Sequence, residues 1–347
     1  MTSATHAAAQ IDLEAVETYL TGVIPGFRGP LSAEKTPTGQ SNPTFILTAG
    51  SGDYVLRRKP PGQLLKSAHA VDREFRVISA LAGTDVPVPN ALHLCEDESV
   101  VGSMFYVMER VPGRVLFDPA LPGLDNDARA KMYDDMNRCL AALHSVDYKA
   151  VGLEDFGRPG SYFARQLSRW TKQYRASETE RIEDMENLIA WLEARVPEDD
   201  DRTTIVHGDY RIDNLIYHPT EPRIVAVLDW ELSTLGHPIA DLAYQRMQGR
   251  LPPGEVGRGL AGVDRKALGI PTEDEYVEMY MKRTGLTEIP ELPFATAFSF
   301  FRICAILQGV KKRGLDGNAS NPEAAIRMGD KIQIMAKLGV ECAETEG

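Results

Sequence analysis

The chain has 347 residues, of which 43% are hydrophobic and 25% charged, and its formal net charge is −12. This length exceeds what one hydrophobic core usually holds, so we expect two structural units. An acidic chain argues against a nucleic-acid-binding function, and the four cysteines are too widely spaced for a C-x-x-C metal or redox pair.

The first third of the chain predicts a small sheet with one long helix. Residues 1–10 lack the basic and apolar regions of a secretory signal, so we expect a cytoplasmic protein. Alternating apolar residues and turn signals predict strands, and apolar residues at helical spacing predict helices. The predicted helices are 12–20 and 67–82, and the predicted strands are 43–48, 54–58, 91–96 and 103–111.

After Pro112 and Gly113 the pattern becomes mainly helical. The apolar segment 294–310 carries Arg302 and is too short for a bilayer span, so we expect a buried helix and no membrane partner. A β-rich front and a helical rear predict two lobes, 1–112 and 113–347, with a cleft between them. The predicted helices are 125–146, 161–176, 179–196, 239–248, 273–283, 292–313 and 323–338, and two strands are predicted at 205–207 and 224–230.

One segment has the residue types that phosphoryl transfer needs. In His207-Gly-Asp-Tyr-Arg-Ile-Asp-Asn214, Asp209 and Asn214 are five positions apart on the loop after a strand, and Asp229 ends the next predicted strand. If these two strands pair, the three side chains meet at one end of the hairpin. One carboxylate can orient the attacking hydroxyl and accept its proton, while an amide and a second carboxylate can hold Mg²⁺.

This H-G-D-x-x-x-x-N motif, followed by an apolar strand ending in Asp229, resembles the aminoglycoside phosphotransferase and choline kinase-like superfamily. The resemblance covers residues 24–320 and implies an α+β, protein-kinase-like two-lobe fold, with a β-rich N-lobe and a mainly helical C-lobe. It also implies ATP as co-substrate, Mg²⁺ as cofactor and a small-molecule hydroxyl as acceptor. Asp209 matches the catalytic base, and Asn214 and Asp229 match the metal ligands.

Other acidic residues near the motif have two interpretations. Asp241 lies in a run that resembles the family's G-x-P-x-x-D-L-A, where it would fix the catalytic loop by hydrogen bonds; equally, it could be a carboxylate favoured by a helix N-terminus. His207 matches a residue that supports the loop. We interpret Asp213 and Glu231 as structural or solvated.

The resemblance also implies a nucleotide site in the N-lobe. The position of its basic residue falls on Arg57, where the family usually has lysine, and strand alternation places Lys59 on the same side. Glu74 matches the helix glutamate that pairs with this base, although a solvated helix glutamate would have the same pattern. The remaining candidates lie on a nucleotide-covering loop and on the strand that joins the lobes: Ser41, Met108, Glu109 and Val111.

The acceptor is the least determined part of the prediction. Aminoglycosides are polycations, whereas the stretch 232–270 is net basic, which favours an anionic acceptor. Lys59-Pro-Pro-Gly62 and Gln308-Gly-Val-Lys-Lys-Arg313 resemble the kinase-like domain fused to some acyl-CoA dehydrogenases, which is associated with phosphorylation of hydroxyacyl-CoA compounds. The alternatives are a true aminoglycoside kinase and a catalytically silent nucleotide-binding module. Retention of Asp209, Asn214 and Asp229 favours an active enzyme.

Overall fold

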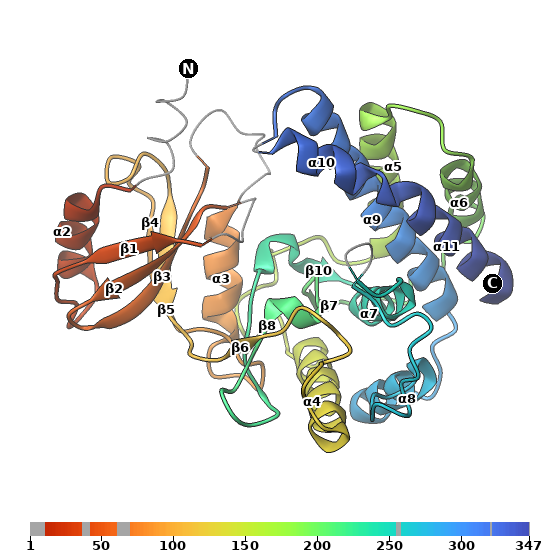
Figure 1. Cartoon of the computed structure of the whole chain (residues 1–347), viewed down its shortest axis with the longest axis horizontal. Helices are drawn as coiled ribbons and strands as arrows, with labels where there is room; N and C mark the ends of the chain where they lie inside the picture. Colours follow the sequence, from red (N-terminus) through yellow and green to blue (C-terminus); the bar gives the residue numbers. More distant parts are fainter. Residues whose placement is uncertain (1–10, 37–41, 61–69, 255–257, 320, 347) are drawn as a thin grey trace.

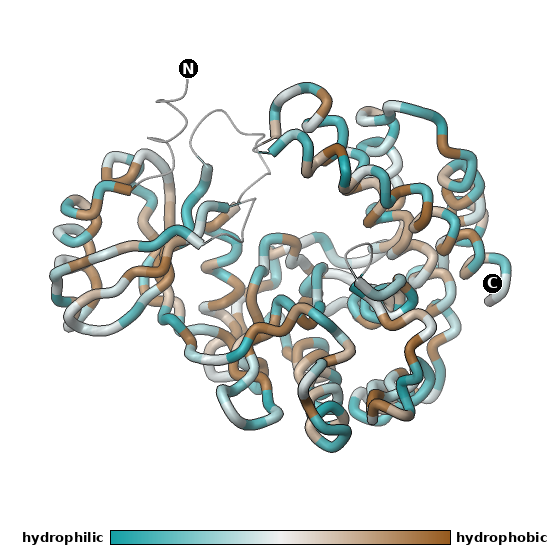
Figure 2. The backbone as a smooth tube through the Cα atoms, viewed as in Figure 1, coloured by the Kyte–Doolittle hydropathy of each residue, from teal (hydrophilic) through white to brown (hydrophobic). Residues whose placement is uncertain are grey.

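The computed structural model describes residues 11–36, 42–60, 70–254, 258–319 and 321–346. A β-rich lobe and a larger helical lobe lie side by side, joined by the segment after β5 (Figure 1). The two-lobe α+β fold expected from the sequence is therefore confirmed. In Figure 2, apolar stretches run through the interior of both lobes, and many peripheral loops are hydrophilic.

The N-lobe is built on a five-stranded antiparallel sheet in the order β1-β2-β3-β5-β4. Two helices, α2 and α3, complete this lobe. The predicted strands are confirmed within one or two residues at most ends, and β1 was missed. The elements are β1 Ser32–Lys35, β2 Thr44–Ala49, β3 Gly52–Arg58, β4 Ala91–Cys95, β5 Phe105–Glu109, α2 Leu13–Val23 and α3 Val71–Leu81.

The two faces of the sheet have different apolar partners. Successive side chains of a strand point to opposite faces, so β5 contributes to both. Phe105 and Val107 pack into a cluster with Leu20 of α2, whereas Tyr106 and Met108 join the larger core that includes α3. The sheet therefore presents one face to α2 and the other face to α3 and the C-lobe.

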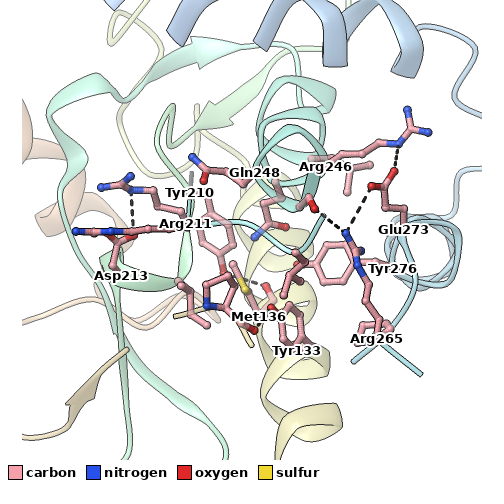
Figure 3. A pocket seen from close by; sticks show the side chains of 18 of the residues that line it. Tyr133, Met136, Tyr210, Arg211, Asp213, Arg246, Gln248, Arg265, Glu273 and Tyr276 are labelled. Atoms are coloured by element: carbon pink, nitrogen blue, oxygen red, sulfur yellow. Dashed lines mark hydrogen bonds and ion pairs between the residues drawn. The ribbon is translucent and has the colours of Figure 1, made fainter. Parts of the chain in front are cut away.

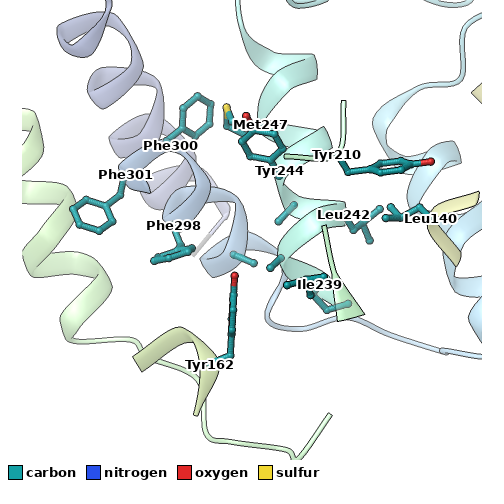
Figure 4. Close-up of a cluster of buried hydrophobic side chains, with 14 of the residues drawn as sticks. Leu140, Tyr162, Tyr210, Ile239, Leu242, Tyr244, Met247, Phe298, Phe300 and Phe301 are labelled. Atoms are coloured by element: carbon teal, nitrogen blue, oxygen red, sulfur yellow. The ribbon is translucent and has the colours of Figure 1, made fainter. Parts of the chain in front are cut away.

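The C-lobe is organised around α9, which contacts α5, α6, α7, α10 and α11. Figure 4 shows part of this core, where Phe300 of α9 lies beside Met247 of α7. The helix predicted over 323–338 is wrong as one element, because the chain breaks at Asp330 into two helices. The helices are α4 Asn126–His144, α5 Tyr162–Ser177, α6 Glu183–Glu193, α7 Ile239–Arg250, α8 Glu273–Thr284, α9 Leu292–Leu315, α10 Pro322–Gly329 and α11 Lys331–Glu346.

Helix α9 is longer than the sequence suggested. At 24 residues it is long and apolar enough to cross a membrane by length and composition alone, so the expectation that this segment is too short for a bilayer span is wrong. However, 78% of its most apolar window is buried inside the structure, as expected for a core helix. Arg302 is buried with it.

Two small sheets carry the loop that contains Asp209. Strand β7 pairs with β10, and β9 pairs with β8, so the condition considered from the sequence, that β7 and β9 pair with each other, is not met. Strands β8 and β10, of three residues each, were not predicted from the sequence. These elements are β6 Arg114–Val115, β7 Thr204–Val206, β8 Leu215–Tyr217, β9 Ile224–Val227, β10 Thr234–Gly236 and the 3₁₀ turns η1 Ile212–Asn214 and η2 Trp230–Leu232.

Candidate active site

Asp209 lies on the loop between β7 and β8, and both of its carboxylate oxygens accept hydrogen bonds. Asn214 Nδ2 donates to Asp209 Oδ2 and to the Asp209 carbonyl oxygen, each at 2.9 Å. The Tyr244 hydroxyl of α7 donates to Oδ1 at 2.6 Å. The carboxylate is therefore held from two directions, once from its own loop and once from a core helix.

Asp241, in the first turn of α7, holds the backbone of the same loop. Its carboxylate accepts from the His207 amide at 2.6 Å and from the Gly208 amide at 2.8 Å. His144 Nε2 lies 3.3 Å from Oδ2. Burial would raise the pKa of Asp241, but the hydrogen bond from His144 and the charges of His144 and His207 hold that pKa below its ordinary value. The geometry supports the loop-fixing interpretation of Asp241.

The Gly208 peptide is also held through its carbonyl oxygen. Arg302 NH2 of α9 donates to this oxygen at 2.7 Å. Gly208 has a φ of +84°, and a Cβ here would lie 2.8 Å from the Leu232 carbonyl oxygen. Only glycine fits this left-handed, tightly packed position without strain. The loop therefore has a rigid backbone directly before Asp209.

His207 uses both ring nitrogens to support the loop. Its Nε2 lies 2.8 Å from the Leu228 carbonyl oxygen, and its Nδ1 accepts from the Asp209 amide at 3.2 Å. The ring therefore bridges the loop to the segment that leads into Asp229.

Asn214 and Asp229 come together through β8 and β9. Leu215 is paired with Val227, and the Leu228 amide donates to the Asn214 carbonyl oxygen at 2.8 Å. Asp229 then adopts a left-handed conformation with φ +65°. The expected proximity of these two residues is therefore produced by a strand pair that the sequence did not reveal.

Arg57 connects the N-lobe to this cluster. Its Nε lies 3.1 Å from Glu74 Oε2, and its NH2 lies 3.0 Å from Asp229 Oδ1. Glu74 is fully buried and also accepts from Asn42 Nδ2 at 2.8 Å and from the Tyr106 hydroxyl at 3.0 Å. Burial raises the pKa of Glu74, and the Arg57 charge opposes that rise. A solvated position for Glu74 is excluded.

The other predicted nucleotide residues are spread along the N-lobe. Strand β3 ends at Arg58, and Lys59 Nζ lies 3.6 Å from Asp72 Oδ1 at a partly exposed position. Met108 is buried in β5, Glu109 is exposed at its end and Val111 is half-buried beyond it. Ser41 lies outside the described residues.

Asp213 is held by two arginines instead of being solvated. Arg211 Nε lies 3.0 Å from Asp213 Oδ1, and Arg258 NH1 lies 3.4 Å from Asp213 Oδ2. Burial raises the pKa of Asp213, opposed by the charge of Arg211. Arg211 Nε also lies 3.5 Å from Asp209 Oδ2, so it is a cation beside the Asp209 carboxylate.

Sequence reasoning missed Tyr244 and Arg302, although both left a signal. Tyr244 is three positions after Asp241, and residues at this spacing share a helix face. Arg302 is a charged residue within the most apolar helix, where an unpaired charge would be costly. Asn42 and Tyr106, which are the partners of Glu74, left no such signal in the sequence.

A separate cluster of Asp200, His237 and Glu291 places three possible metal-ligand atoms within 4.8 Å of one another. Arg202 NH2 already lies 2.7 Å from Glu291 Oε1 and contacts Asp200 as well. An arginine thus supplies the positive charge between these carboxylates.

Comparisons with known proteins give matches over most of the chain. A model of the phosphotransferase enzyme family matches residues 32–269. Mouse acyl-CoA dehydrogenase family member 10 is 48% identical over 339 residues, which are 97% of this chain and 32% of that protein. Human acyl-CoA dehydrogenase family member 11 is 39% identical over 96% of this chain and 43% of its own length. The chain therefore spans less than half the length of these curated relatives.

Solved structures show the same fold. A Ralstonia eutropha protein provisionally assigned as an aminoglycoside phosphotransferase is 52% identical, with a TM-score of 0.88 over 97% of this chain and all of that one. An aminoglycoside phosphotransferase solved with ADP and hygromycin B has a TM-score of 0.63 at 15% identity, over 94% of this chain and 98% of its own. The second likeness concerns the fold alone.

Proposed function

Because the chain belongs to the phosphotransferase enzyme family, we propose that it transfers the γ-phosphoryl group of ATP to a hydroxyl of a small molecule, with Mg²⁺ as cofactor. The observation that carries this proposal is the doubly held carboxylate of Asp209, which is linked through Asn214 to the segment that carries Asp229 and its ion pair with Arg57. Phosphoryl transfer depends mainly on positioning and charge, and this cluster offers a base, oxygen ligands and cations.

Asp209 is proposed as the base that orients the acceptor hydroxyl and takes its proton. A carboxylate oxygen has two lone pairs, so the hydrogen bonds from Asn214 and Tyr244 leave room for a third donor. These bonds also fix the direction in which the remaining lone pairs point. Arg211, 3.5 Å away, adds positive charge where a transferring phosphoryl group develops negative charge.

Asn214 and Asp229 fit a magnesium site. The Asn214 amide directs its nitrogen to two Asp209 oxygens, which leaves its own oxygen for a cation. The Asp229 ion pair with Arg57 uses Oδ1, and among the described residues no hydrogen bond is made to Oδ2. Mg²⁺ prefers such oxygen ligands, and when bound it would neutralise phosphate charge.

Arg57 is proposed as the phosphate-binding cation, oriented by Glu74. Its guanidinium can bind a phosphate through two parallel hydrogen bonds, so arginine can serve where relatives have lysine. Lys59 remains a weaker candidate because it faces Asp72. Met108, Glu109 and Val111 are proposed to line the adenine side, since they lie where the chain passes from one lobe to the other.

An anionic acceptor such as a hydroxyacyl-CoA is the acceptor we favour. The relatives named as acyl-CoA dehydrogenase family members support this class. Next to the catalytic loop, the described lining of a cavity includes four arginines and two carboxylates: Arg211, Arg246, Arg258, Arg265, Asp213 and Glu273. This net basic lining is unsuited to polycationic aminoglycosides.

The proposal can be tested with the purified chain by measuring ATP consumption over a panel of hydroxyl compounds, including a hydroxyacyl-CoA and an aminoglycoside. We expect Asp209→Asn to remove turnover while Mg·ATP still raises the melting temperature. A melting-temperature increase with Mg·ATP and no turnover of any compound would instead support a silent nucleotide-binding module.

A further inference from the structure

A cavity lies beside the catalytic loop, between α4, α7 and α8 (Figure 3). Residues 210–213 form one side of it, directly after Asp209. Much of the remaining lining is apolar or aromatic, including Phe117, Met136, Leu242, Leu260 and Tyr133. Such a lining suits an apolar molecule or the apolar part of one.

Two polar side chains in this lining have unused hydrogen-bonding capacity. Both the amide nitrogen and the amide oxygen of Gln245 are buried without a hydrogen-bond partner among the described residues, and so is the hydroxyl of Tyr276. The Tyr276 hydroxyl lies beside the Gln245 amide, where the two form no hydrogen bond of standard geometry. Buried polar groups are normally paired, so the Gln245 amide and the Tyr276 hydroxyl have capacity for an occupant beyond their contact with each other.

The chemistry of the three atoms restricts that occupant. Gln245 needs an acceptor for its nitrogen and a donor for its oxygen, and this holds whichever way the amide is turned. A carboxylate offers acceptors only, and an ammonium group offers donors only, so neither can pair with both atoms of the Gln245 amide. A neutral amide or hydroxyl both donates and accepts, and it matches Gln245 and Tyr276.

The cavity also has a physical connection to the proposed base. Arg211 lines the cavity and lies 3.5 Å from Asp209 Oδ2. On α7, Gln245 directly follows Tyr244, whose hydroxyl bonds to Asp209 Oδ1. A molecule in the cavity therefore lies against the loop and the helix that together hold Asp209.

We propose that this cavity binds the acceptor through an uncharged apolar segment that carries an amide or hydroxyl group, recognised by Gln245 and Tyr276. This inference rests on the proposed function, because it assigns the cavity to the acceptor of that reaction. The inference is compatible with an anionic group elsewhere in the same acceptor. An acyl chain with amide linkages, attached to a charged carrier, would be an acceptor of this kind. The inference excludes polycationic aminoglycosides from the cavity.

The inference can be tested by saturation-transfer NMR on the full chain without nucleotide. The probes are hexanamide, which is apolar with one amide, hexanoate, which has the same chain with an acceptor-only head, and kanamycin. We expect hexanamide to bind more tightly than hexanoate, because only its head group both donates and accepts, and we expect no saturation of kanamycin. Gln245→Leu should weaken hexanamide binding by about 3- to 10-fold, the effect of losing a hydrogen bond. Gln173→Leu, on α5 and outside the cavity lining, is the matched control and should bind as the unaltered chain does.

A second variant and a kinetic measurement keep the test independent of folding. Tyr276→Phe removes only the hydroxyl and should also weaken binding of hexanamide. With 6-hydroxyhexanamide as acceptor, Gln245→Leu should raise KM for that compound and leave kcat unchanged. Equal hexanamide binding by the unaltered chain and Gln245→Leu overturns the inference.

The two proposals fail in different ways. Asp209→Asn should still bind hexanamide, because the cavity does not use that carboxylate. If Asp209→Asn keeps full ATP turnover while hexanamide binding depends on Gln245, the assignment of the base is wrong. The cavity would then remain a binding site, but its assignment to the acceptor would be overturned.

Discussion

Tyr244 donates a hydrogen bond of 2.6 Å to Oδ1 of Asp209, although the two residues are 35 positions apart in the chain. The bond joins the core helix α7 to the loop after β7. Burial, and then the nearby Asp209 carboxylate, raise the pKa of Tyr244 far above its ordinary value, so the hydroxyl remains a donor throughout the physiological pH range. Asp209 is therefore oriented by a group that does not titrate under working conditions.

The first prediction concerns this bond. We expect Tyr244→Phe to lower kcat by about 10-fold, because a hydrogen bond to a charged group is lost. KM for ATP should change little, since Tyr244 does not contact the Arg57 cluster. Tyr174→Phe is the control, because its buried hydroxyl has no partner among the described residues. An unchanged kcat in Tyr244→Phe would show that Asn214 alone orients Asp209.

The second prediction separates Arg57 from Lys59. Arg57→Lys keeps the charge but cannot contact Glu74 and Asp229 through a planar fork, so KM for ATP should rise by roughly 10-fold. Lys59→Met should change it by less than about 3-fold, because an exposed ion pair contributes little. Steady-state kinetics at varied ATP would check both. The reverse ranking would place the phosphates against Lys59.

The third prediction concerns the metal. Asp229→Asn should weaken binding of Mg·ATP but not of ATP measured in EDTA, because only the metal-dependent contact is removed. Titration calorimetry with and without Mg²⁺ would measure this difference. The control is Asp72→Asn, which removes the partner of Lys59 outside the cluster. If Asp229→Asn weakens ATP binding equally with and without Mg²⁺, Asp229 acts through Arg57 instead of through the metal.

The fourth prediction is a pH dependence of stability. The pKa of Asp241 is lowered in the folded protein from its ordinary value of 3.8. A carboxyl group whose pKa is lowered by folding stabilises the folded protein above pH 4 or so. This stabilisation is lost as the pH falls through the lowered pKa. Urea unfolding between about pH 2 and pH 7 should show this loss, most of it below pH 4 or so.

Asp241→Asn provides the comparison for that measurement. It should remove the acid-dependent loss and lower the free energy of unfolding at pH 7 by about 1–3 kcal/mol, because a buried loop amide is left without an acceptor. An unfolding curve with the same pH dependence in both proteins would assign the effect to other carboxylates.

The fifth prediction tests the link from α9 to the loop. Arg302→Met keeps most of the side-chain volume but leaves the buried Gly208 carbonyl without its donor. We expect a moderately lower melting temperature, because a buried acceptor is left unpaired, and a kcat lowered several-fold, because the loop before Asp209 is held less firmly. Arg302→Lys should restore part of the activity. A large fall in melting temperature with an unchanged kcat would make Arg302 purely structural.

Part of the site could be predicted because it is local. Asn214 reaches Asp209 across five residues of one loop, so the spacing in the sequence motif is enough to predict that the two side chains are close. Strands β2 and β3 were found because they are long enough to show alternation and are joined by a short turn. By contrast, β8 and β10 have three residues each, and their pairing is set by packing on the C-lobe core.

The sequence by itself determined the family, the two lobes and the spacing of Asp209 and Asn214. Only the tertiary structure shows that Arg57 pairs with Glu74 and Asp229, whereas Lys59, just beyond the end of β3, lies beside Asp72. The Arg57–Asp229 pair joins residues 172 positions apart, and Glu74 is buried beneath it. No periodicity encodes such contacts, because they arise when whole lobes pack together and exclude water from the groups between them.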